Sequence, residues 1–402
     1  MENLNISCLL NNLQTNYDPE IFDFSNIKIA GKVIKFHKSL PGYKPTPLVN
    51  LSCLANKLGI SHLLVKDESQ RFNLNAFKVL GASYAIAKVL GNRLNLGEEE
   101  LIFDKILSAQ PKFLNTTFVT ATDGNHGRAV AWVSEKLGCK AIVYLPKNSS
   151  PARLQAIKQF GAKAFITNFN YDDTVIYAEK MAKQKKWILL QDTSWDGYEK
   201  VPTHIMQGYF TLVTEFLSQE PKIWPTHIFL QAGVGSLAAG VLACMYTSAK
   251  KNKPKFIVVE PEGAPCLYNS MALNEGRPYR VKGDLPTIMA GLACGEPSRL
   301  GLKILKSRAA AFIKCSDHVA RQGMKIYANP LPGDGTIISG ESGAVTLGLV
   351  YELLSNKRFK HLKDKLDITR DAKILLTRQK NTRNLFLNML YSSPWKNEMQ
   401  EN

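Results

Sequence analysis

The stretch NAFKVLGAS, residues 75–83, follows a predicted strand at 62–66 and opens a predicted helix, and it decides the fold that we expect. Asn75 is one of the residue types that cap helix N-termini, which places Lys78 in the first helical turn beside the apolar Phe77. The positive helix end and apolar neighbours both disfavour an ammonium ion. We therefore expect a neutral Lys78 amine that can form a Schiff base with an aldehyde. A lone helical lysine is more often a surface residue, so this interpretation depends on the rest of the chain.

The composition indicates a globular protein with room for two domains: 402 residues, 45% hydrophobic and 21% charged. There is no run of 18 apolar residues and no signal-peptide pattern at the first residues, so we expect no membrane association. Seven scattered cysteines without a CxxC pair or metal-type spacing are typical of a reducing cytoplasm and predict no metal site.

The formal charge of +17 raises the alternative of nucleic-acid binding. The basic residues are spread along the chain, however, and lack the interleaved aromatic residues of a surface that binds single strands. A solvated basic surface that attracts anionic substrates is the simpler interpretation, and we expect no nucleic-acid partner.

Strands alternate with helices along most of the chain, which predicts a parallel α/β sheet. The sheet is expected in two blocks, one inserted into the other, with a large domain at 1–88 and 225–402 and a small domain at 89–224. Residues 1–40 read as a polar arm with one short strand near 32–36. The other predicted strands are 113–120, 139–146, 162–167, 187–191, 226–231, 255–260 and 373–376, and the predicted helices include 151–160, 172–185, 202–217 and 236–248.

A glycine-rich loop, Gly233-Val234-Gly235-Ser236, joins a predicted strand to a helix. Converging backbone amides at a helix N-terminus favour an anion such as a phosphate. The same loop is also compatible with an ordinary tight turn, or with a dinucleotide site in which Glu260 binds the ribose. Against a dinucleotide site, Gly240 comes too late for the GxGxxG spacing.

Two further loops follow predicted strands and face the same expected crevice. One is Thr122-Asp123-Gly124-Asn125-His126, where the helix start can hold a carboxylate and Asn125 can donate to a ring oxygen. The other places the Asp192 carboxylate at a strand end. A lysine, a phosphate-binding loop and an asparagine near a ring together describe a site for pyridoxal 5′-phosphate.

The chain resembles the diaminopropionate ammonia-lyases, which are fold type II (tryptophan-synthase-beta-like) pyridoxal-phosphate enzymes. The similarity covers roughly residues 35–376. The matching motifs are YKPTPL at 43–48, KDES at 66–69, RFNLNAFKVLGASYA at 71–85, TATDGNHG at 120–127, QDTSWDGY at 191–198, PTHIMQGY at 202–209, QAGVGS at 231–236, TIMAGLACGEPS at 287–298 and SGESGAVTLG at 339–348.

The resemblance implies a two-domain α/β fold with the cofactor in the interdomain cleft, and a homodimer. Lys78 is implied as the Schiff-base lysine and Asn125 as the contact of the ring hydroxyl. The implied cofactor-binding residues are Lys78, Phe77, Asn125, Gly233, Val234, Gly235, Ser236 and Thr377.

The implied reaction converts 2,3-diaminopropionate and water to pyruvate and two ammonia. Because the β-amine leaves only when protonated, an acidic pocket is favoured. The resemblance implies that both enantiomers react, with Asp123 as the base for the D-isomer, Asp192 as the base for the L-isomer, and Lys78 as a further base on its own face. The implied substrate-binding residues are Thr122, Asp123, Gly124, His126 and Asp192.

Two alternatives remain beside this reaction. Related serine and threonine dehydratases have a serine-type loop where this chain has Asp123, and such a dehydratase is the alternative enzyme. A catalytically impaired homologue that binds anionic partners is the alternative outside enzymes.

Two local features bear on the site. Cys266 and Cys294 lie in family-like segments, so a reversible disulfide is a hypothesis beside two buried thiols. After Leu376 the family continues with a Ser/Thr-Glu-Gly segment beside the pyridine nitrogen, whereas this chain reads TRQKNT at 377–382. Thr377 is then the candidate for the missing hydroxyl.

Overall fold

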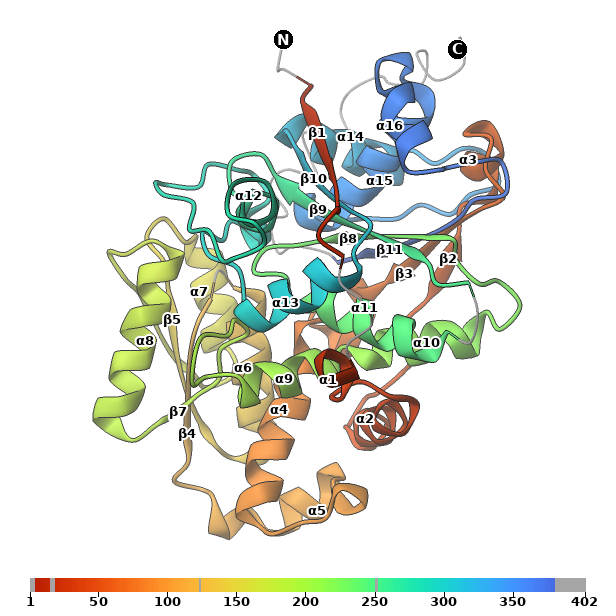
Figure 1. The fold of residues 1–402 in the computed structure, drawn as a ribbon. Coiled ribbons are helices and arrows are strands. Elements are labelled where there is room, and N and C mark those ends of the chain that lie inside the picture. The colour runs from red at the N-terminus through yellow and green to blue at the C-terminus, as the bar shows by residue number, and fades with distance from the viewer. Residues whose placement is uncertain (1–3, 15–18, 123, 250–251, 380–402) are drawn as a thin grey trace.

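The computed structural model describes residues 4–14, 19–122, 124–249 and 252–379. Two sheets organise this part of the chain (Figure 1). The larger sheet has seven strands in the order β1-β10-β9-β8-β11-β3-β2, in which the inner strands are parallel and β1 and β2 pair antiparallel at the edges. Their bounds are β1 Ile6–Leu10, β2 Leu48–Asn50, β3 His62–Asp67, β8 His227–Gln231, β9 Lys255–Pro261, β10 Ala311–Cys315 and β11 Lys373–Arg378.

The smaller sheet is parallel throughout, with the order β6-β5-β4-β7. Its strands are β4 Thr117–Ala121, β5 Lys140–Leu145, β6 Lys163–Ile166 and β7 Ile188–Leu189. They lie in sequence between β3 and β8 of the larger sheet. The exact domain boundaries at 88/89 and 224/225 stay a prediction.

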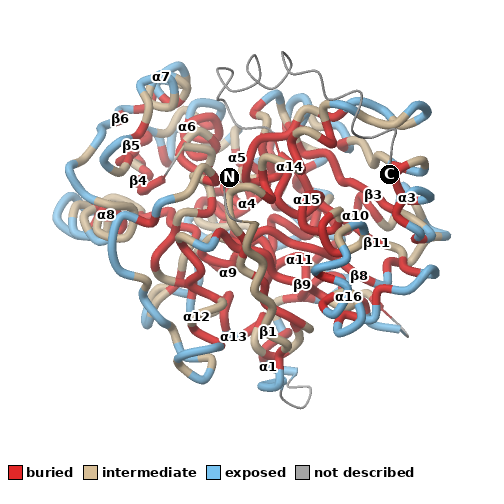
Figure 2. Tube along the Cα trace, turned by 90° about the horizontal axis from the view of Figure 1, so that it is seen from above, coloured by how far each residue is buried: buried red, intermediate tan, exposed pale blue. Residues whose placement is uncertain are grey.

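Helices cover both faces of the larger sheet, as the alternation of its side chains requires. In β8, Ile228 and Leu230 pack into the core that contains α11 and α13, whereas Phe229 packs into the core of α14 and α15. Figure 2 shows the buried chain running through α11, α15 and the central strands, with exposed segments around the rim. The helices are α1 Pro19–Phe22, α2 Ile27–Ser39, α3 Ser52–Lys57, α4 Lys78–Arg93, α5 Phe103–Ser108, α6 Asn125–Leu137, α7 Pro151–Lys158, α8 Tyr171–Lys185, α9 Lys200–Gly208, α10 Phe210–Gln219, α11 Ser236–Ser248, α12 Cys266–Leu273, α13 Arg299–Arg308, α14 Asp317–Ala328, α15 Glu341–Ser355 and α16 Lys360–Lys365.

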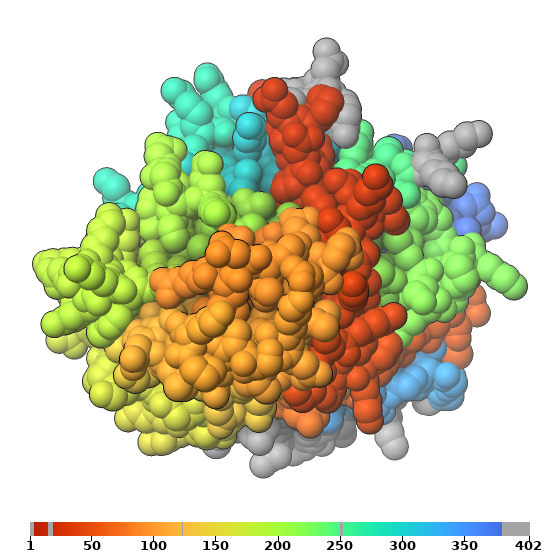
Figure 3. Space-filling model, turned by 90° about the horizontal axis from the view of Figure 1, so that it is seen from below, coloured from red at the N-terminus to blue at the C-terminus, as the bar shows by residue number. Residues whose placement is uncertain are grey.

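Helix α4, which starts at Lys78, packs against α6 of the smaller unit and α9. It crosses α9 closely because Gly208 carries no side chain: a Cβ there would lie 2.3 Å from the Leu80 carbonyl oxygen. On the face seen in Figure 3, the orange segment that contains α5 lies between the yellow segment of the smaller sheet and the red N-terminal segment. The segment that presents Lys78 is thus held by both parts of the fold.

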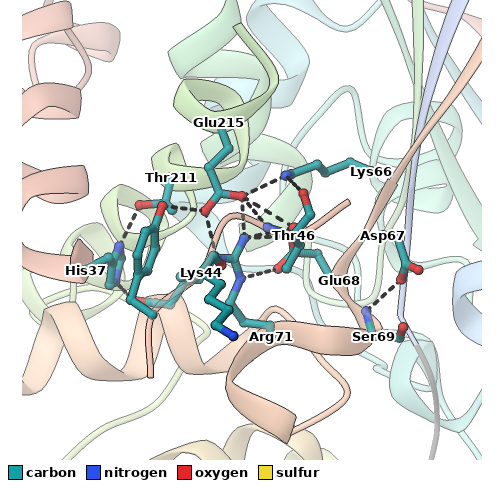
Figure 4. Close-up of polar contacts among 12 residues, drawn as sticks. His37, Lys44, Thr46, Lys66, Asp67, Glu68, Ser69, Arg71, Thr211 and Glu215 are labelled. Atoms are coloured by element: carbon teal, nitrogen blue, oxygen red, sulfur yellow. Dashed lines mark hydrogen bonds and ion pairs between the residues drawn. The ribbon is translucent and has the colours of Figure 1, made fainter. Parts of the chain in front are cut away.

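A buried cluster of charges fixes the turn between β3 and Lys78 (Figure 4). The Arg71 guanidinium donates to Glu68 (Nε–Oε2, 2.8 Å) and to Glu215 of α10 (Nη1–Oε1, 2.7 Å). Lys66 Nζ lies 2.7 Å from Glu215 Oε2 and 2.6 Å from the Thr46 carbonyl oxygen. Two cations face two carboxylates, so the cluster is neutral as a whole and ties β3 to α10.

Three local predictions are wrong. The strand expected near 32–36 is part of α2, where Asn26 caps the helix by accepting from Ile29 N at 3.0 Å and Val33 and Phe36 face the core. The single helix expected at 202–217 is two helices that meet at Tyr209. Asn75 does not cap α4: its φ is +60°, and Phe77 is the N-cap residue without a side-chain bond.

Candidate active site

A cavity lies where the carboxyl ends of strands from both sheets meet, as expected for parallel α/β sheets. It takes residues from the ends of β4 and β7 of the smaller sheet, from the ends of β8 and β11 of the larger sheet, and from the start of α4. Its lining residues are Phe77, Lys78, Ala121, Thr122, His126, Tyr171, Asp192, Gln231, Ala232, Gly233, Val234, Gly235, Ser236, Leu237, Ala290, Gly291, Leu292, Ala293, Cys294 and Gln379.

Lys78 is the first residue of α4, and its amine faces an acid in the cavity. Lys78 Nζ forms an ion pair with Asp192 Oδ2 and lies 5.6 Å from the centroid of the Phe77 ring. The expected apolar surround is therefore wrong for the end of the side chain. The Asp192 carboxylate faces the amine directly, and the expected neutral amine stays a prediction.

Asp192 is 3% exposed, and neighbouring charges act on its carboxyl group. Burial acts to raise its pKa, but the Lys78 ammonium and His126 outweigh burial and lower the pKa to about 2. Tyr171 donates its hydroxyl to Asp192 Oδ1 at 3.4 Å. The carboxyl group is therefore ionised at neutral pH for as long as Lys78 is charged.

The neighbouring Gln191 fixes the direction in which Asp192 points. Gln191 Oε1 accepts from Thr120 Oγ1 and from Ala121 N, both at 3.0 Å, and its Nε2 donates to the Tyr171 hydroxyl at 3.1 Å. These bonds join the ends of β4 and β7 beneath the acid. Sequence reasoning missed Gln191 and Tyr171, although Gln191 lies within the quoted QDTSWDGY motif.

The glycine loop after β8 forms a cradle at the N-terminus of α11. Gly235 has φ +95°, and a Cβ on Gly233 would lie 2.9 Å from Cys294 Sγ, so both positions require glycine. Ser236 Oγ donates to the Asp192 carbonyl oxygen at 2.5 Å, which ties the cradle to the acid. The first-turn amides of α11 remain available for an anion.

The loop after β4 brings only part of the expected set to the cavity. Thr122 and His126 line it; Thr122 Oγ1 accepts from Gly124 N at 2.9 Å, and His126 Nε2 donates to the Leu190 carbonyl at 2.8 Å. Gly124 has φ +149°, and Asn125 starts α6; neither residue is among those that line the cavity. Asp123 lies outside the described residues.

The end of β11 places a different residue in the cavity from the one expected. Thr377 is 4% exposed, is not among the lining residues, and donates its hydroxyl to Gln231 Oε1 at 3.2 Å. Gln231 and Gln379 line the cavity instead. The unfamiliar sequence after Gln379 lies outside the described residues.

Glu260, the acidic residue that a dinucleotide site would need for the ribose, has another role in the structure. Glu260 is fully buried and accepts from Leu267 N at 2.8 Å and from Tyr268 N at 2.7 Å, so its carboxyl group anchors the start of α12. Burial raises its pKa to about 8. Glu260 is not among the residues that line the cavity.

The two cysteines of the disulfide hypothesis both lie beside Gly233, and both are thiols in this structure. Cys266 Sγ donates to the Gly233 carbonyl at 3.4 Å, and burial raises the pKa of Cys266. Their reversible pairing stays a prediction.

Within the described ranges, no group of three or more His, Cys, Asp or Glu side chains is arranged to hold a metal ion. In the same ranges, none of the helices is both long and apolar enough to cross a membrane.

The residues of the cavity fit pyridoxal 5′-phosphate. Lys78 presents an amine for the aldehyde, the Gly233–Ser236 loop presents a cradle that a Cβ would fill, and buried amide groups remain for the ring. A family model described as "Pyridoxal-phosphate dependent enzyme" matches residues 39–365. The match spans most of the chain and includes the residues of the cavity up to Cys294. The protein is therefore a pyridoxal-phosphate-dependent enzyme, and the expected fold class is confirmed.

Comparison with curated proteins narrows the class. Diaminopropionate ammonia-lyase of Salmonella typhimurium strain LT2 is 48% identical over 357 residues, which is 87% of this chain and 88% of the relative. The Escherichia coli K12 enzyme of the same name is 46% identical over 358 residues, 89% of this chain and 88% of the relative. The chain belongs to the diaminopropionate ammonia-lyase family.

Solved structures agree with this assignment. The structure of the Escherichia coli enzyme in complex with an aminoacrylate-PLP azomethine reaction intermediate has a TM-score of 0.87 and 41% identity, and covers 98% of both chains. The processed form of threonine deaminase isoform 2 from Solanum lycopersicum has a TM-score of 0.71 at 19% identity, covering 96% of both chains, and shares the fold alone.

Proposed function

We propose that this chain converts 2,3-diaminopropionate, as the D- or the L-isomer, and water into pyruvate and two ammonia. The observation that carries the proposal is the pairing of Lys78 with the buried Asp192 beside the glycine cradle. Identities of 46–48% to enzymes named for this substrate support it. A serine or threonine dehydratase is less favoured, because the threonine deaminase comparison supports the fold only.

The proposed cofactor contacts follow the chemistry of each residue. Lys78 would form the Schiff base, and the loop from Gly233 to Ser236 would hold the phosphate through backbone amides. Phe77 would border the ring, Asn125 would donate to the ring hydroxyl, and Thr377 would act through its hydrogen bond to Gln231. When bound, pyridoxal 5′-phosphate supplies an electron sink that acidifies the Cα proton of an amino acid.

Two carboxylates are proposed as bases for the two enantiomers. Their Cα protons point to opposite faces, so one base cannot reach both; Asp192 serves the L-isomer, and Asp123 serves the D-isomer. The same groups attract the β-amine and keep it in the cationic form, so that it takes the C–N bonding electrons and departs as ammonia without a further proton. Thr122, Gly124 and His126 complete the substrate-binding set.

The strength of Asp192 as a base changes with the charge of Lys78. Beside the ammonium, its pKa of about 2 makes it a poor proton acceptor. Once the Lys78 nitrogen is no longer an ammonium, burial acts without that opposing charge and raises the carboxyl pKa. The loss of the Lys78 charge therefore makes Asp192 a stronger base. Lys78 can itself act as the base for a Cα proton on the face where its amine lies.

The experiment that distinguishes a diaminopropionate lyase from a serine or threonine dehydratase compares substrates that carry an amine or a hydroxyl group on the β-carbon. Purified protein with pyridoxal 5′-phosphate is assayed for 2-oxo acid formation from D- and L-diaminopropionate, D- and L-serine and L-threonine. We expect a higher kcat/KM for the β-amine substrates by at least about tenfold, the effect of about 1.4 kcal/mol. A preference for L-serine or L-threonine would assign a dehydratase.

We also propose a homodimer in the cytoplasm, with a large domain at 1–88 and 225–402 and a small domain at 89–224. The family resemblance supports the dimer, and seven cysteines as thiols suit a reducing compartment. The presence of two separate sheets supports the division into two domains.

A further inference from the structure

Two buried amide groups in the cavity wall carry atoms that the rest of the site leaves unused. Gln231 is 2% exposed and Gln379 is 3% exposed, and both line the cavity. Among the described residues, Gln231 Nε2 and Gln379 Oε1 have no hydrogen-bond partner. Buried amide atoms without partners cost free energy, so their presence in a ligand cavity points to a polar atom of the ligand.

Three other polar groups of the cavity have partners. Thr122 Oγ1 accepts from Gly124 N, Ser236 Oγ donates to the Asp192 carbonyl, and the Asp192 carboxylate pairs with Lys78.

The sheet order places these glutamines between the two anchors of the cofactor. Strand β11 lies between β8, which leads into the glycine cradle, and β3, which leads to Lys78. Gln231 ends β8, and Gln379 directly follows β11. In pyridoxal 5′-phosphate the ring nitrogen lies across the ring from the aldehyde-bearing carbon, so a group other than Lys78 and the cradle has to meet it.

We propose that the side-chain amide of Gln231 binds the ring nitrogen of the cofactor, in place of the hydroxyl that the family resemblance implies, and that Gln379 borders the same end of the ring. Gln231 Nε2 donates to the unprotonated nitrogen, since the side chain is neutral and the Asp192 carboxylate is taken by Lys78, whereas Gln379 Oε1 can only accept a hydrogen bond. Thr377 acts through its bond to Gln231 Oε1. The proposal rests on the cofactor and is independent of the substrate.

A cofactor analogue tests the contact directly. In 1-deazapyridoxal 5′-phosphate a C–H replaces the ring nitrogen, and its affinity is compared with that of pyridoxal 5′-phosphate by absorbance titration of the cofactor-free full chain. We expect wild type to prefer the natural cofactor about tenfold, the effect of one hydrogen bond. In Gln231→Met/Gln379→Met this preference falls to about onefold, because only the natural cofactor loses affinity.

Gln207→Met is the matched control. Gln207 is another buried glutamine, but its Nε2 donates to the Phe24 carbonyl at 3.0 Å and it does not line the cavity. This variant keeps the tenfold preference. Thermal unfolding of each cofactor-free variant verifies that the fold is intact, and each single glutamine variant supplies a milder change if the double variant does not fold.

The proposal is overturned if the glutamine variants keep the preference, or if Thr377→Val abolishes it while they do not. Equal affinities of wild type for both compounds also contradict it. Failure of wild type to bind either compound would instead reject the cofactor itself, whereas binding without lyase activity would reject only the substrate.

Discussion

The ammonium of Lys78 and the carboxylate of Asp192 form an ion pair across the cavity, although the two residues are 114 positions apart in sequence. The two residues follow strands of different sheets: Lys78 follows β3 of the larger sheet, and Asp192 follows β7 of the smaller sheet. The pair holds the site in a neutral state before the cofactor binds, and the charge of Lys78 affects whether Asp192 can accept a proton.

Removal of the Lys78 charge should change how stability depends on pH. In Lys78→Met, burial raises the Asp192 pKa above the ordinary value of 3.8, so stability falls as the pH rises above about 3.8. We expect a loss on the order of 3 kcal/mol near neutral pH, measured by urea unfolding of the cofactor-free protein. In Lys78→Met/Asp192→Asn this pH dependence disappears; its persistence would mean that another group causes it.

Loss of Glu215 should destabilise the turn that leads to Lys78. Glu215→Gln leaves the buried Lys66 and Arg71 with only one carboxylate between them. We expect a loss of about 3–5 kcal/mol in the free energy of unfolding. The control is Asp367→Asn, which breaks an ion pair with Lys255 at an exposed site and should leave the free energy of unfolding close to that of wild type. Equal effects of the two variants would contradict a role for the buried cluster.

Acid should weaken the fold through His37. This fully buried ring donates through Nε2 to the Leu80 carbonyl at 3.0 Å and accepts from Thr211 Oγ1 at 2.6 Å. Burial, followed by the charge of Arg71, lowers its pKa from 6.5 to about 3. The unfolded chain binds the proton first, so stability is full above about pH 6.5 and falls as the pH drops toward 3.

The measurement for His37 is the urea midpoint between pH 7 and pH 4. His37→Gln should show a flatter profile than wild type, whereas the exposed His361→Gln should follow wild type. A wild-type slope in His37→Gln would assign the acid sensitivity elsewhere.

A methyl group in the phosphate cradle should weaken cofactor binding. Gly233→Ala places a Cβ 2.9 Å from Cys294 Sγ and 3.3 Å from Leu292 Cα. We expect cofactor affinity to fall by at least about tenfold, which corresponds to 1.4 kcal/mol. Gly31→Ala is the control, because its Cβ meets nothing within 4 Å in the middle of α2, where alanine is favoured. Unchanged affinity in Gly233→Ala would place the phosphate elsewhere.

The parallel sheet and its order of strands and helices could be predicted from local patterns, because buried strands ending in glycine-rich or polar turns have clear signals. The short stretch Lys32-Phe36 predicts a strand when taken alone, whereas the buried Val33 and Phe36 belong to one face of a longer helix. Asn75 predicts a helix cap, but asparagine is also one of the residue types that most readily adopt a positive φ, and with φ +60° it belongs to the turn before α4.

The site was predictable where one residue type is chemically necessary, as for Lys78 and the glycines of the cradle. The ion pair with Asp192 could not be predicted, because it depends on how two sheets meet. Gln379 could not be predicted either: its importance comes from a buried amide oxygen without a partner among the described residues, which only coordinates reveal.

The most direct test of the central claim is one paired measurement on wild type and Lys78→Ala. The visible spectrum is recorded after addition of pyridoxal 5′-phosphate, and pyruvate is then assayed with D- and L-diaminopropionate. The account predicts a Schiff-base absorption band and pyruvate in wild type, and neither in the variant. A wild-type band that survives in Lys78→Ala, or pyruvate formed at the same rate by both proteins, would contradict the assignment of Lys78 and with it the account of the site.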